Sequence, residues 1–373
     1  MNRPRALAVT AVVALLFTVL PPSVLRGQEI GRIAYLEGDV QLLRDGEILD
    51  AYDIRDGEPL LQLDVIQTGF DGYVEVELDR PSPSIVRVRE NSAYYVELSG
   101  DGARTDVRLR VLAGRLQMDV SSLTAGSTLS VETQTAVLGV RGTTFDVLTA
   151  PDETTLFGVR EGRVAIASAG GQISAAAGQA VEAPGSGRPS REPVSDGDFD
   201  AYYARWTEIR LQAFRSGAPT FVRAYVRRYL DTRDTFDRAY RDLVAFRPRL
   251  EEALASEAGS LGTDMRFRAE MSPAIIRMRS ILPLFETTVY RLRELQRFHS
   301  QGIGRTQIGE RDSTTFFRAF SMDERELLRR LAEVRTIFRM YGELEDRSFG
   351  GLPDGTGDSP FESGGSLLDS MRF

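Results

Sequence analysis

The first half of the chain is dominated by short runs in which apolar and polar residues alternate. Two such runs are Tyr73–Leu78 and Ser84–Arg89, and the densest is Thr133–Val147. A period of two is typical of strands with one buried face. Asp-Gly pairs such as Asp71-Gly72 separate the runs and mark tight turns. The pattern predicts an all-β domain over residues 28–185, built as a sandwich, barrel or solenoid.

A short glycine-centred pattern recurs three times in this half. Each copy has an apolar residue, two further residues, a glycine, and then apolar residues at alternate positions. The copies are Tyr35–Leu42, Val111–Met118 and Val159–Ile166. Their spacing is unequal, so they predict a recurring bend of the chain and not a strict array. A bend before each inward-facing strand favours the solenoid-like option.

The hydrophobic pattern changes to the helical period after a stretch rich in proline, glycine and serine. Residues 186–197 are therefore expected to be a linker, and residues 198–347 an α-helical domain. The predicted fold class is a multidomain chain, all-β in front and all-α behind.

Four or five amphipathic helices are expected in this second half, and together they predict a helical bundle. Asp198 is placed to cap the first helix. The third helical segment contains Pro273 and Pro283, so breaks are expected there. The last helix is expected to begin at a capping box that starts at Ser321.

The amino-acid composition excludes several kinds of covalent and catalytic chemistry. The 373 residues include no cysteine, and all 46 basic residues are arginine, which excludes disulfides, thiolate nucleophiles and lysine Schiff bases. The single histidine, His299, has no second histidine or cysteine with which to share a metal, and a solvated position at a helix end is expected for it. The net charge of −8 is uneven, because acids exceed arginines over 28–197 while arginines slightly exceed acids over 198–347.

The first 27 residues are typical of an export signal. Arg3 and Arg5 precede the apolar run Ala6–Leu20. We expect a signal peptide over 1–27 or, if it is not cleaved, an anchor in the inner membrane. The body of the protein is then expected in the periplasm or at the cell surface of a Gram-negative-type bacterium. The final segment, 348–373, is rich in glycine, serine and acids and is expected to be a disordered acidic tail.

A series of motifs in the first half points to a known family. In order, they are Gly38-x-Val40, Leu63-Asp-Val-Ile-Gln-Thr-Gly69, Glu90-Asn-Ser92, Leu112-Ala-Gly114, Thr133-x-Thr-Ala136, Val140-Arg-Gly-Thr-x-Phe145-x-Val147, Val159-Arg-Glu-Gly-Arg-Val164 and Ala177-Gly-Gln-Ala180. Over roughly residues 30–185 the series resembles the FecR domain, the periplasmic module of ferric-citrate-type iron signalling regulators. The resemblance implies an all-β, two-sheeted, solenoid-like domain that works by protein–protein contact outside the inner membrane.

The chain also departs from the signalling members of that family. Those members carry a cytoplasmic anti-sigma segment before their membrane helix, whereas only Met1–Arg5 precede the apolar run here. The resemblance therefore implies a stand-alone, exported version of the domain.

The resemblance marks several signature positions, for which a structural role is expected. These positions are Thr135, Ala136, Val140, Arg141, Gly142, Thr143, Phe145, Gly162 and Gly178. Arg141 is the one most open to a role in binding, because a guanidinium can hold a carboxylate through two parallel hydrogen bonds. The alternative is that Arg141 pairs with a nearby acid or carbonyl and stabilises the fold.

These observations favour a non-enzymatic exported protein that binds an envelope protein through strand edges or the acidic faces of the β domain. The alternative is a structural scaffold associated with carbohydrate or peptidoglycan. An enzyme is disfavoured, because no paired-carboxylate motif stands out and the usual nucleophile–base arrangements lack their histidine. No catalytic, metal or cofactor site and no nucleic-acid partner are expected. The helical domain is the expected site of any homo-oligomer contact.

Overall fold

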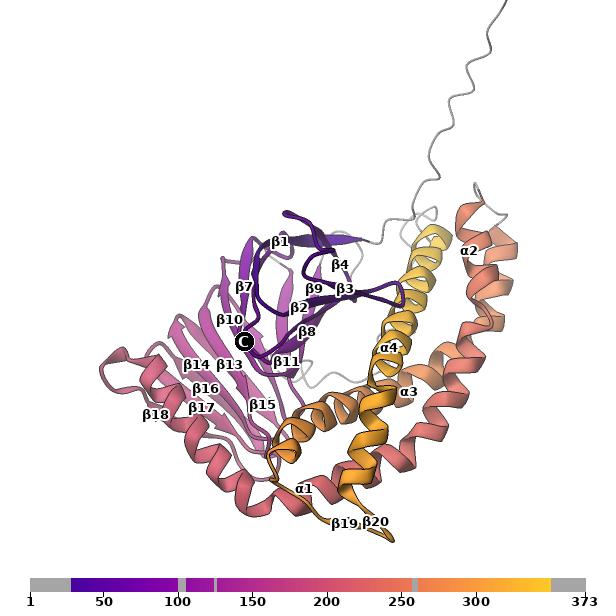
Figure 1. Cartoon of the computed structure of the whole chain (residues 1–373). Helices are drawn as coiled ribbons and strands as arrows, with labels where there is room; N and C mark the ends of the chain where they lie inside the picture. Colours follow the sequence, from indigo (N-terminus) through magenta and orange to yellow (C-terminus); the bar gives the residue numbers. More distant parts are fainter. Residues whose placement is uncertain (1–27, 100–104, 124–125, 257–260, 350–373) are drawn as a thin grey trace, which may run out of the picture.

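Strands fill the first part of the chain and helices the second. The structure is a computed structural model that describes residues 28–99, 105–123, 126–256 and 261–349 (Figure 1). Two large sheets are followed by a helical region, which confirms the β-then-α order of the predicted fold class. The solenoid-like label stays a prediction.

Each of the two large sheets has nine strands. In sheet A the strands lie in the order β18-β17-β14-β13-β10-β7-β6-β1-β4, and in sheet B in the order β16-β15-β12-β11-β9-β8-β5-β2-β3. The strands of sheet A are β1 (Glu29–Glu37), β4 (Pro59–Leu61), β6 (Tyr73–Leu78), β7 (Ser84–Val88), β10 (Arg115–Val120), β13 (Thr144–Thr149), β14 (Thr155–Glu161), β17 (Gln179–Ala183) and β18 (Ser190–Pro193). Those of sheet B are β2 (Val40–Arg44), β3 (Glu47–Asp50), β5 (Val65–Thr68), β8 (Ala93–Ser99), β9 (Asp106–Ala113), β11 (Thr128–Glu132), β12 (Ala136–Val140), β15 (Arg163–Ser168) and β16 (Gly171–Ala176).

The alternating residues of the strands build a core between the two sheets. On β6, Val74 and Val76 are fully buried in this core, whereas Glu75 between them lies on the outer face. On β13, Phe145 and Val147 point inward in the same way. Because side chains alternate between faces, a slip of one residue in either strand would move its apolar side chains to the outer face.

The chain passes from one sheet to the other at glycines with a positive φ. Gly38, Gly114 and Gly162 connect β1 to β2, β9 to β10 and β14 to β15, with φ of 73°, 90° and 83°. These are the three glycines of the recurring pattern, so the predicted bends are confirmed. Gly142 and Gly178 occupy the equivalent positions between β12 and β13 and between β16 and β17. Glycine adopts this left-handed conformation with little strain, which explains its recurrence at the corners.

The helical region contains four helices in the described part of the chain. They are α1 (Phe199–Val244), α2 (Arg247–Ala255), α3 (Leu261–Ser300) and α4 (Ser313–Phe349). Two short strands that the sequence did not predict, β19 (Gln307–Ile308) and β20 (Arg311–Asp312), pair between α3 and α4. The helix cap predicted at Asp198 is confirmed, because its side chain accepts a hydrogen bond from the Ala201 N–H at 3.0 Å. In Figure 1, α1 starts beside β18 and α4 lies next to β3.

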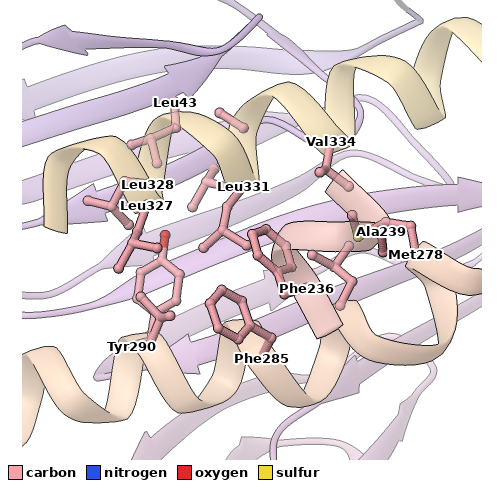
Figure 2. Packing of buried hydrophobic residues seen from close by; sticks show 14 of the residues in the cluster. Leu43, Phe236, Ala239, Met278, Phe285, Tyr290, Leu327, Leu328, Leu331 and Val334 are labelled. Atoms are coloured by element: carbon pink, nitrogen blue, oxygen red, sulfur yellow. The ribbon is translucent and has the colours of Figure 1, made fainter. Parts of the chain in front are cut away.

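The helices and sheet B share one hydrophobic core. Figure 2 shows Phe236 of α1 next to Phe285 of α3, with Leu331 of α4 above them. The rings of Phe236 and Phe285 stack with their centroids 4.1 Å apart. Leu43 and Tyr95 of sheet B belong to the same buried cluster. The outer face of sheet B is thus one wall of the helical core. Whether residues 28–185 and 198–347 fold as independent domains, as the sequence predicts, stays a prediction.

The expected linker contains regular structure. Ser190–Pro193, inside the stretch 186–197, form β18, which pairs antiparallel with β17. Polar and proline-rich composition predicted a loop here, but an edge strand tolerates both because its outer side faces water.

Two helix boundaries also differ from the sequence prediction. The breaks expected at Pro273 and Pro283 are wrong, because α3 continues through both prolines. Each proline removes a single backbone hydrogen bond, and the long buried face of α3 offsets that loss. The start expected at Ser321 is also wrong: α4 begins at Ser313, and Ser321 Oγ donates to the Phe317 carbonyl inside the helix at 2.8 Å.

Within the described residues, no helix combines the length and the apolar character needed to cross a membrane. The predicted leader, 1–27, lies outside the described residues. So does the predicted tail, 348–373, apart from Ser348 and Phe349, which end α4.

Candidate binding groove

Most of the signature residues lie in the core or at the corners. Ala136, Val140, Thr143 and Phe145 are buried. Thr135 Oγ1 is 2.8 Å from Thr155 Oγ1. The glycines Gly142, Gly162 and Gly178 are corner residues with positive φ, and a Cβ at Gly162 would lie 2.6 Å from Thr143 Cγ2. Their positions agree with a structural role for these residues, which stays a prediction.

Arg141 is placed differently from the other signature residues. It is exposed, and it makes no hydrogen bond or ion pair with any residue that the structure describes. The expected pairing with a neighbouring acid or carbonyl is therefore not found among those residues.

A functional residue that the sequence reasoning missed is Asp146, which lies between Phe145 and Val147. Its side chain is fully buried on the outer face of sheet A. It accepts hydrogen bonds from Arg160 at 2.6 Å, from Tyr203 of α1 at 3.0 Å and from Arg115 at 3.3 Å. Burial, together with the charge of Asp146, raises the pKa of Tyr203. The sequence does show that Asp146 is an acid at an outward-facing strand position. It does not show which arginines would contact this acid.

Three of the family motifs meet at one end of the sandwich. Thr68 Oγ1 donates to the Arg89 carbonyl at 2.6 Å and accepts a hydrogen bond from the Ser92 N–H at 3.0 Å. The Asn91 N–H donates to the Gly69 carbonyl at 2.8 Å. A Cβ at Gly69 would lie 2.0 Å from Asp39 Oδ2, so only glycine fits there. These contacts hold the corner loops in one rigid surface.

That surface forms one wall of a groove of about 390 Å³, and α3 forms the other. The sandwich contributes Asp39, Thr68, Gly69, Phe70, Asn91, Ser92, Ala93 and Ala113. The helices contribute Tyr290, Arg293, Glu294, Gln296, Arg297 and Ser300 from α3 and Glu324 from α4. The groove therefore needs both regions of the chain, and sequence reasoning predicted its corner motifs but not the facing helix.

Two arginines of α3 bridge the walls of the groove. Arg293 donates to Gln67 at 2.7 Å and to Glu324 at 2.6 Å. Arg297 donates to the side-chain oxygen of Asn91. Arg293 is thus paired with a carboxylate, whereas Arg297 has no carboxylate within ion-pair distance among the described residues. Burial lowers the pKa of Arg297, because its charge is incompletely compensated.

The floor of the groove holds polar atoms without partners. The hydroxyl of Tyr290 is buried and has no hydrogen-bond partner in the part of the chain that the structure describes, and burial raises its pKa to about 12. Gln296 donates to Ser321 Oγ at 2.7 Å, but its side-chain oxygen also lacks a partner among the described residues. At the rim, Phe70 is 79% exposed. The groove therefore combines one exposed aromatic ring with the exposed guanidinium of Arg297 and other polar side chains, which suits binding of a polar segment.

His299 does not have the solvated position that the sequence analysis expected. It is 4% exposed, lies against the ring of Phe317, and its Nε2 is 2.8 Å from Ser313 Oγ. Ser313 is itself fully buried, and its Oγ accepts a hydrogen bond from the Thr306 N–H at 3.0 Å. The expectation was wrong because the start of α4, through Ser313 and Phe317, covers His299 at the end of α3. A buried serine engaged in this way has no access to a substrate.

The described residues also contain no group of three or more acidic or histidine side chains arranged to hold a metal ion. What the groove geometry offers is recognition: it holds donors, acceptors and an aromatic ring in fixed positions.

The fold and the groove define a two-sheeted β-sandwich with a helical region docked on its corner motifs. Residues 64–165 match the family described as FecR protein, which confirms the resemblance over this part of the sandwich. The match covers β5 to β14 and the start of β15.

Two crystal structures of a candidate anti-sigma factor from Parabacteroides distasonis ATCC 8503, at 1.65 and 2.50 Å resolution, are similar to part of the chain. In both, the identity is 17%, the TM-score is 0.32, and 37% of this chain is covered. The chain covers 64% and 63% of those two chains, which is less than two thirds. This likeness is too weak to extend the role of those proteins to this one. No curated protein matches the sequence.

Proposed function

We propose that this protein is an exported, non-enzymatic FecR-domain protein that acts by binding a protein partner in the bacterial envelope. The observation that carries the proposal is the groove between the FecR-domain corners and α3, which needs both regions of the chain. A FecR domain favours a signalling-related role exerted through protein contact. The basic and apolar residues 1–27 support export.

The experiment uses the full chain in its native host. A photo-crosslinking amino acid is placed at position 70, at the rim of the groove, and in a second strain at position 230. Phe70 and Leu230 are both exposed apolar residues, but Leu230 lies on α1 and does not line the groove. A discrete protein adduct from position 70, absent from position 230, is the expected result. Equal labelling at both positions, or none, would contradict the proposal.

Export is tested separately by fusing residues 1–27 to a reporter enzyme that is active only outside the cytoplasm. We expect activity from this fusion and none when Arg3, Arg5 and the apolar run are deleted. An inactive fusion would remove export from the proposal and leave the binding role to the crosslinking result.

A second candidate function is a carbohydrate-associated scaffold, and one surface favours it. On the outer face of sheet A, the rings of Tyr35 and Tyr73 lie 6.0 Å apart, and Tyr35 is 52% exposed. Glu75 and Arg87 extend this row across the neighbouring strands and are joined at 3.1 Å. Exposed aromatic rings beside polar groups can stack on sugar rings. Co-sedimentation of the full chain with purified peptidoglycan, lost in Tyr35→Ala, would support this candidate.

A further inference from the structure

The groove contains a positive charge that its own surroundings leave without a partner. Arg297 has five N–H donors, and the described residues offer its guanidinium only the Asn91 oxygen. The two carboxylates that the helices contribute to the groove are already paired, because Glu324 pairs with Arg293 and Glu294 pairs with Arg291. Arg297 is exposed and has no carboxylate partner among the described residues, so it can form a charge-assisted, two-pronged hydrogen bond with a carboxylate that arrives from outside.

Two further features restrict what can enter. Phe70 presents its ring to solvent at the rim, next to Gly69 and Asp71, so an incoming apolar side chain can cover it. The side-chain oxygen of Gln296 has no hydrogen-bond partner among the described residues, and a rotation of this half-buried side chain would present it to a peptide group of an incoming chain, whereas the hydroxyl of Tyr290 is too deeply buried to be reached. Figure 2 shows Tyr290 of α3 beside Leu327 and Leu328 of α4, inside the hydrophobic core.

The dimensions of the groove favour a short segment of chain. A volume of about 390 Å³ is at the lower end of the range for binding pockets, enough for a few side chains and not for a folded surface. Asp39, exposed on the sandwich side of the groove, repels a second acid. The charges thus fit a segment with a single acidic residue.

We propose that the groove receives an extended segment of a partner protein that carries one acidic residue beside one apolar residue. The carboxylate binds Arg297 and the apolar side chain packs on Phe70. This inference rests on the proposed function, since it names the chemistry of the partner at the same site.

The test is an array of immobilised 10-residue peptides in which every position is varied, probed with the purified full chain. We expect enrichment of peptides with one acid next to an apolar residue. Arg297→Gln is expected to weaken their binding by about 10- to 100-fold, the range of a lost charge-assisted hydrogen bond. Phe70→Ala is expected to weaken it by about tenfold, as for the loss of a small apolar contact.

The matched control is Arg266→Gln. Arg266 is another exposed arginine of α3 without an ion pair among the described residues, and it lies about 46 Å along the helix from Arg297. Its substitution is expected to leave peptide binding unchanged. Thermal unfolding of Arg297→Gln, Phe70→Ala and Arg266→Gln shows whether any loss of binding follows from a loss of structure. A further variant, Asn91→Ala, leaves Arg297 in place and should retain the preference for acidic peptides.

Three outcomes would overturn the inference: no preference for acidic peptides, the same preference in Arg297→Gln, or succinate binding as tightly as the best peptides. The last outcome would identify a site for small carboxylates. If position 70 still crosslinks to an envelope protein while one of these outcomes holds, the proposed function stands and only the chemistry named here is wrong. If the peptides behave as expected and no crosslink forms in the host, the proposed function fails and the groove chemistry stands.

Discussion

Tyr203 of α1 donates a hydrogen bond to Asp146 in the middle of sheet A at 3.0 Å. Gly158 on the neighbouring strand makes this contact possible, because a Cβ there would lie 1.8 Å from the Tyr203 hydroxyl oxygen. Phe199, Tyr203 and Trp206 form one buried cluster with residues of sheet A. The start of the helical region is therefore fixed to the sandwich by one buried carboxylate and the apolar residues around it.

Asp146→Asn is expected to lower the free energy of unfolding by about 3 kcal/mol, because Arg115 and Arg160 lose their buried counter-charge. Tyr203→Phe removes a single hydrogen bond and is expected to lower it by about 1 kcal/mol. Urea denaturation followed by circular dichroism measures both. The control is Tyr202→Phe, whose hydroxyl makes only a 3.4 Å contact with Glu192. If Asp146→Asn were no more destabilised than this control, the anchoring role of Asp146 would be refuted.

Gly158→Ala is expected to lower the free energy of unfolding by about 1–3 kcal/mol, because the new methyl group overlaps Tyr203. In a Tyr203→Phe background the nearest atom becomes Cζ, 2.8 Å from the added Cβ, so part of the loss should be recovered. A double-mutant cycle measures this coupling. Gly342→Ala in α4 is the control, since its Cβ meets nothing within 4 Å. Strict additivity of the two substitutions would argue against direct contact.

The strand and corner pattern could be predicted because it is local. Gly38, Gly114 and Gly162 stand in a repeated sequence context, and each needs a backbone conformation that glycine adopts most easily. Alternation along β6 and β13 likewise assigned their inner faces. The family resemblance located the same segments, including the loop that ends at Gly69.

The contacts between the two regions could not be predicted, because they join residues far apart in the chain. Nothing near Asp146 indicates that Tyr203 will reach it, and nothing near Arg297 indicates Asn91. The prediction for His299 failed for a similar reason, since its burial depends on contacts with Ser313 and Phe317 at the start of the next helix. The groove can therefore be identified only from a structure that contains both the β-sandwich and the helical region.

Arg335 of α4 and Glu286 of α3 form a buried ion pair, and the guanidinium lies 4.5 Å from the centre of the Tyr95 ring. Arg335→Met alone is expected to lower the free energy of unfolding by about 3–5 kcal/mol, because it leaves Glu286 charged and unpaired in the core. Adding Glu286→Leu removes that charge and should restore most of the stability. Chemical denaturation of both single variants and the double variant measures the effect. A double variant no more stable than Arg335→Met would show that the pair itself contributes the stability.

The single histidine gives the protein a pH dependence that can be isolated by one substitution. Burial lowers the pKa of His299 below its ordinary value of 6.5; the charge of Arg305 lowers it further, and that of Asp312 acts in the opposite direction. Below pH 6.5 the unfolded chain therefore binds a proton that the folded chain does not, so stability falls as the pH drops from 6.5 toward the folded pKa. The loss approaches about 1.4 kcal/mol per pH unit at most, and stability is independent of this group above about pH 7.5. Unfolding measured at pH 8.0, 6.5 and 5.5 should show this slope in the wild type and lack it in His299→Gln, whose amide can keep the bond with Ser313. Parallel curves for the two proteins across this range would mean that His299 titrates equally in the folded and unfolded chain, against the burial seen at the end of α3.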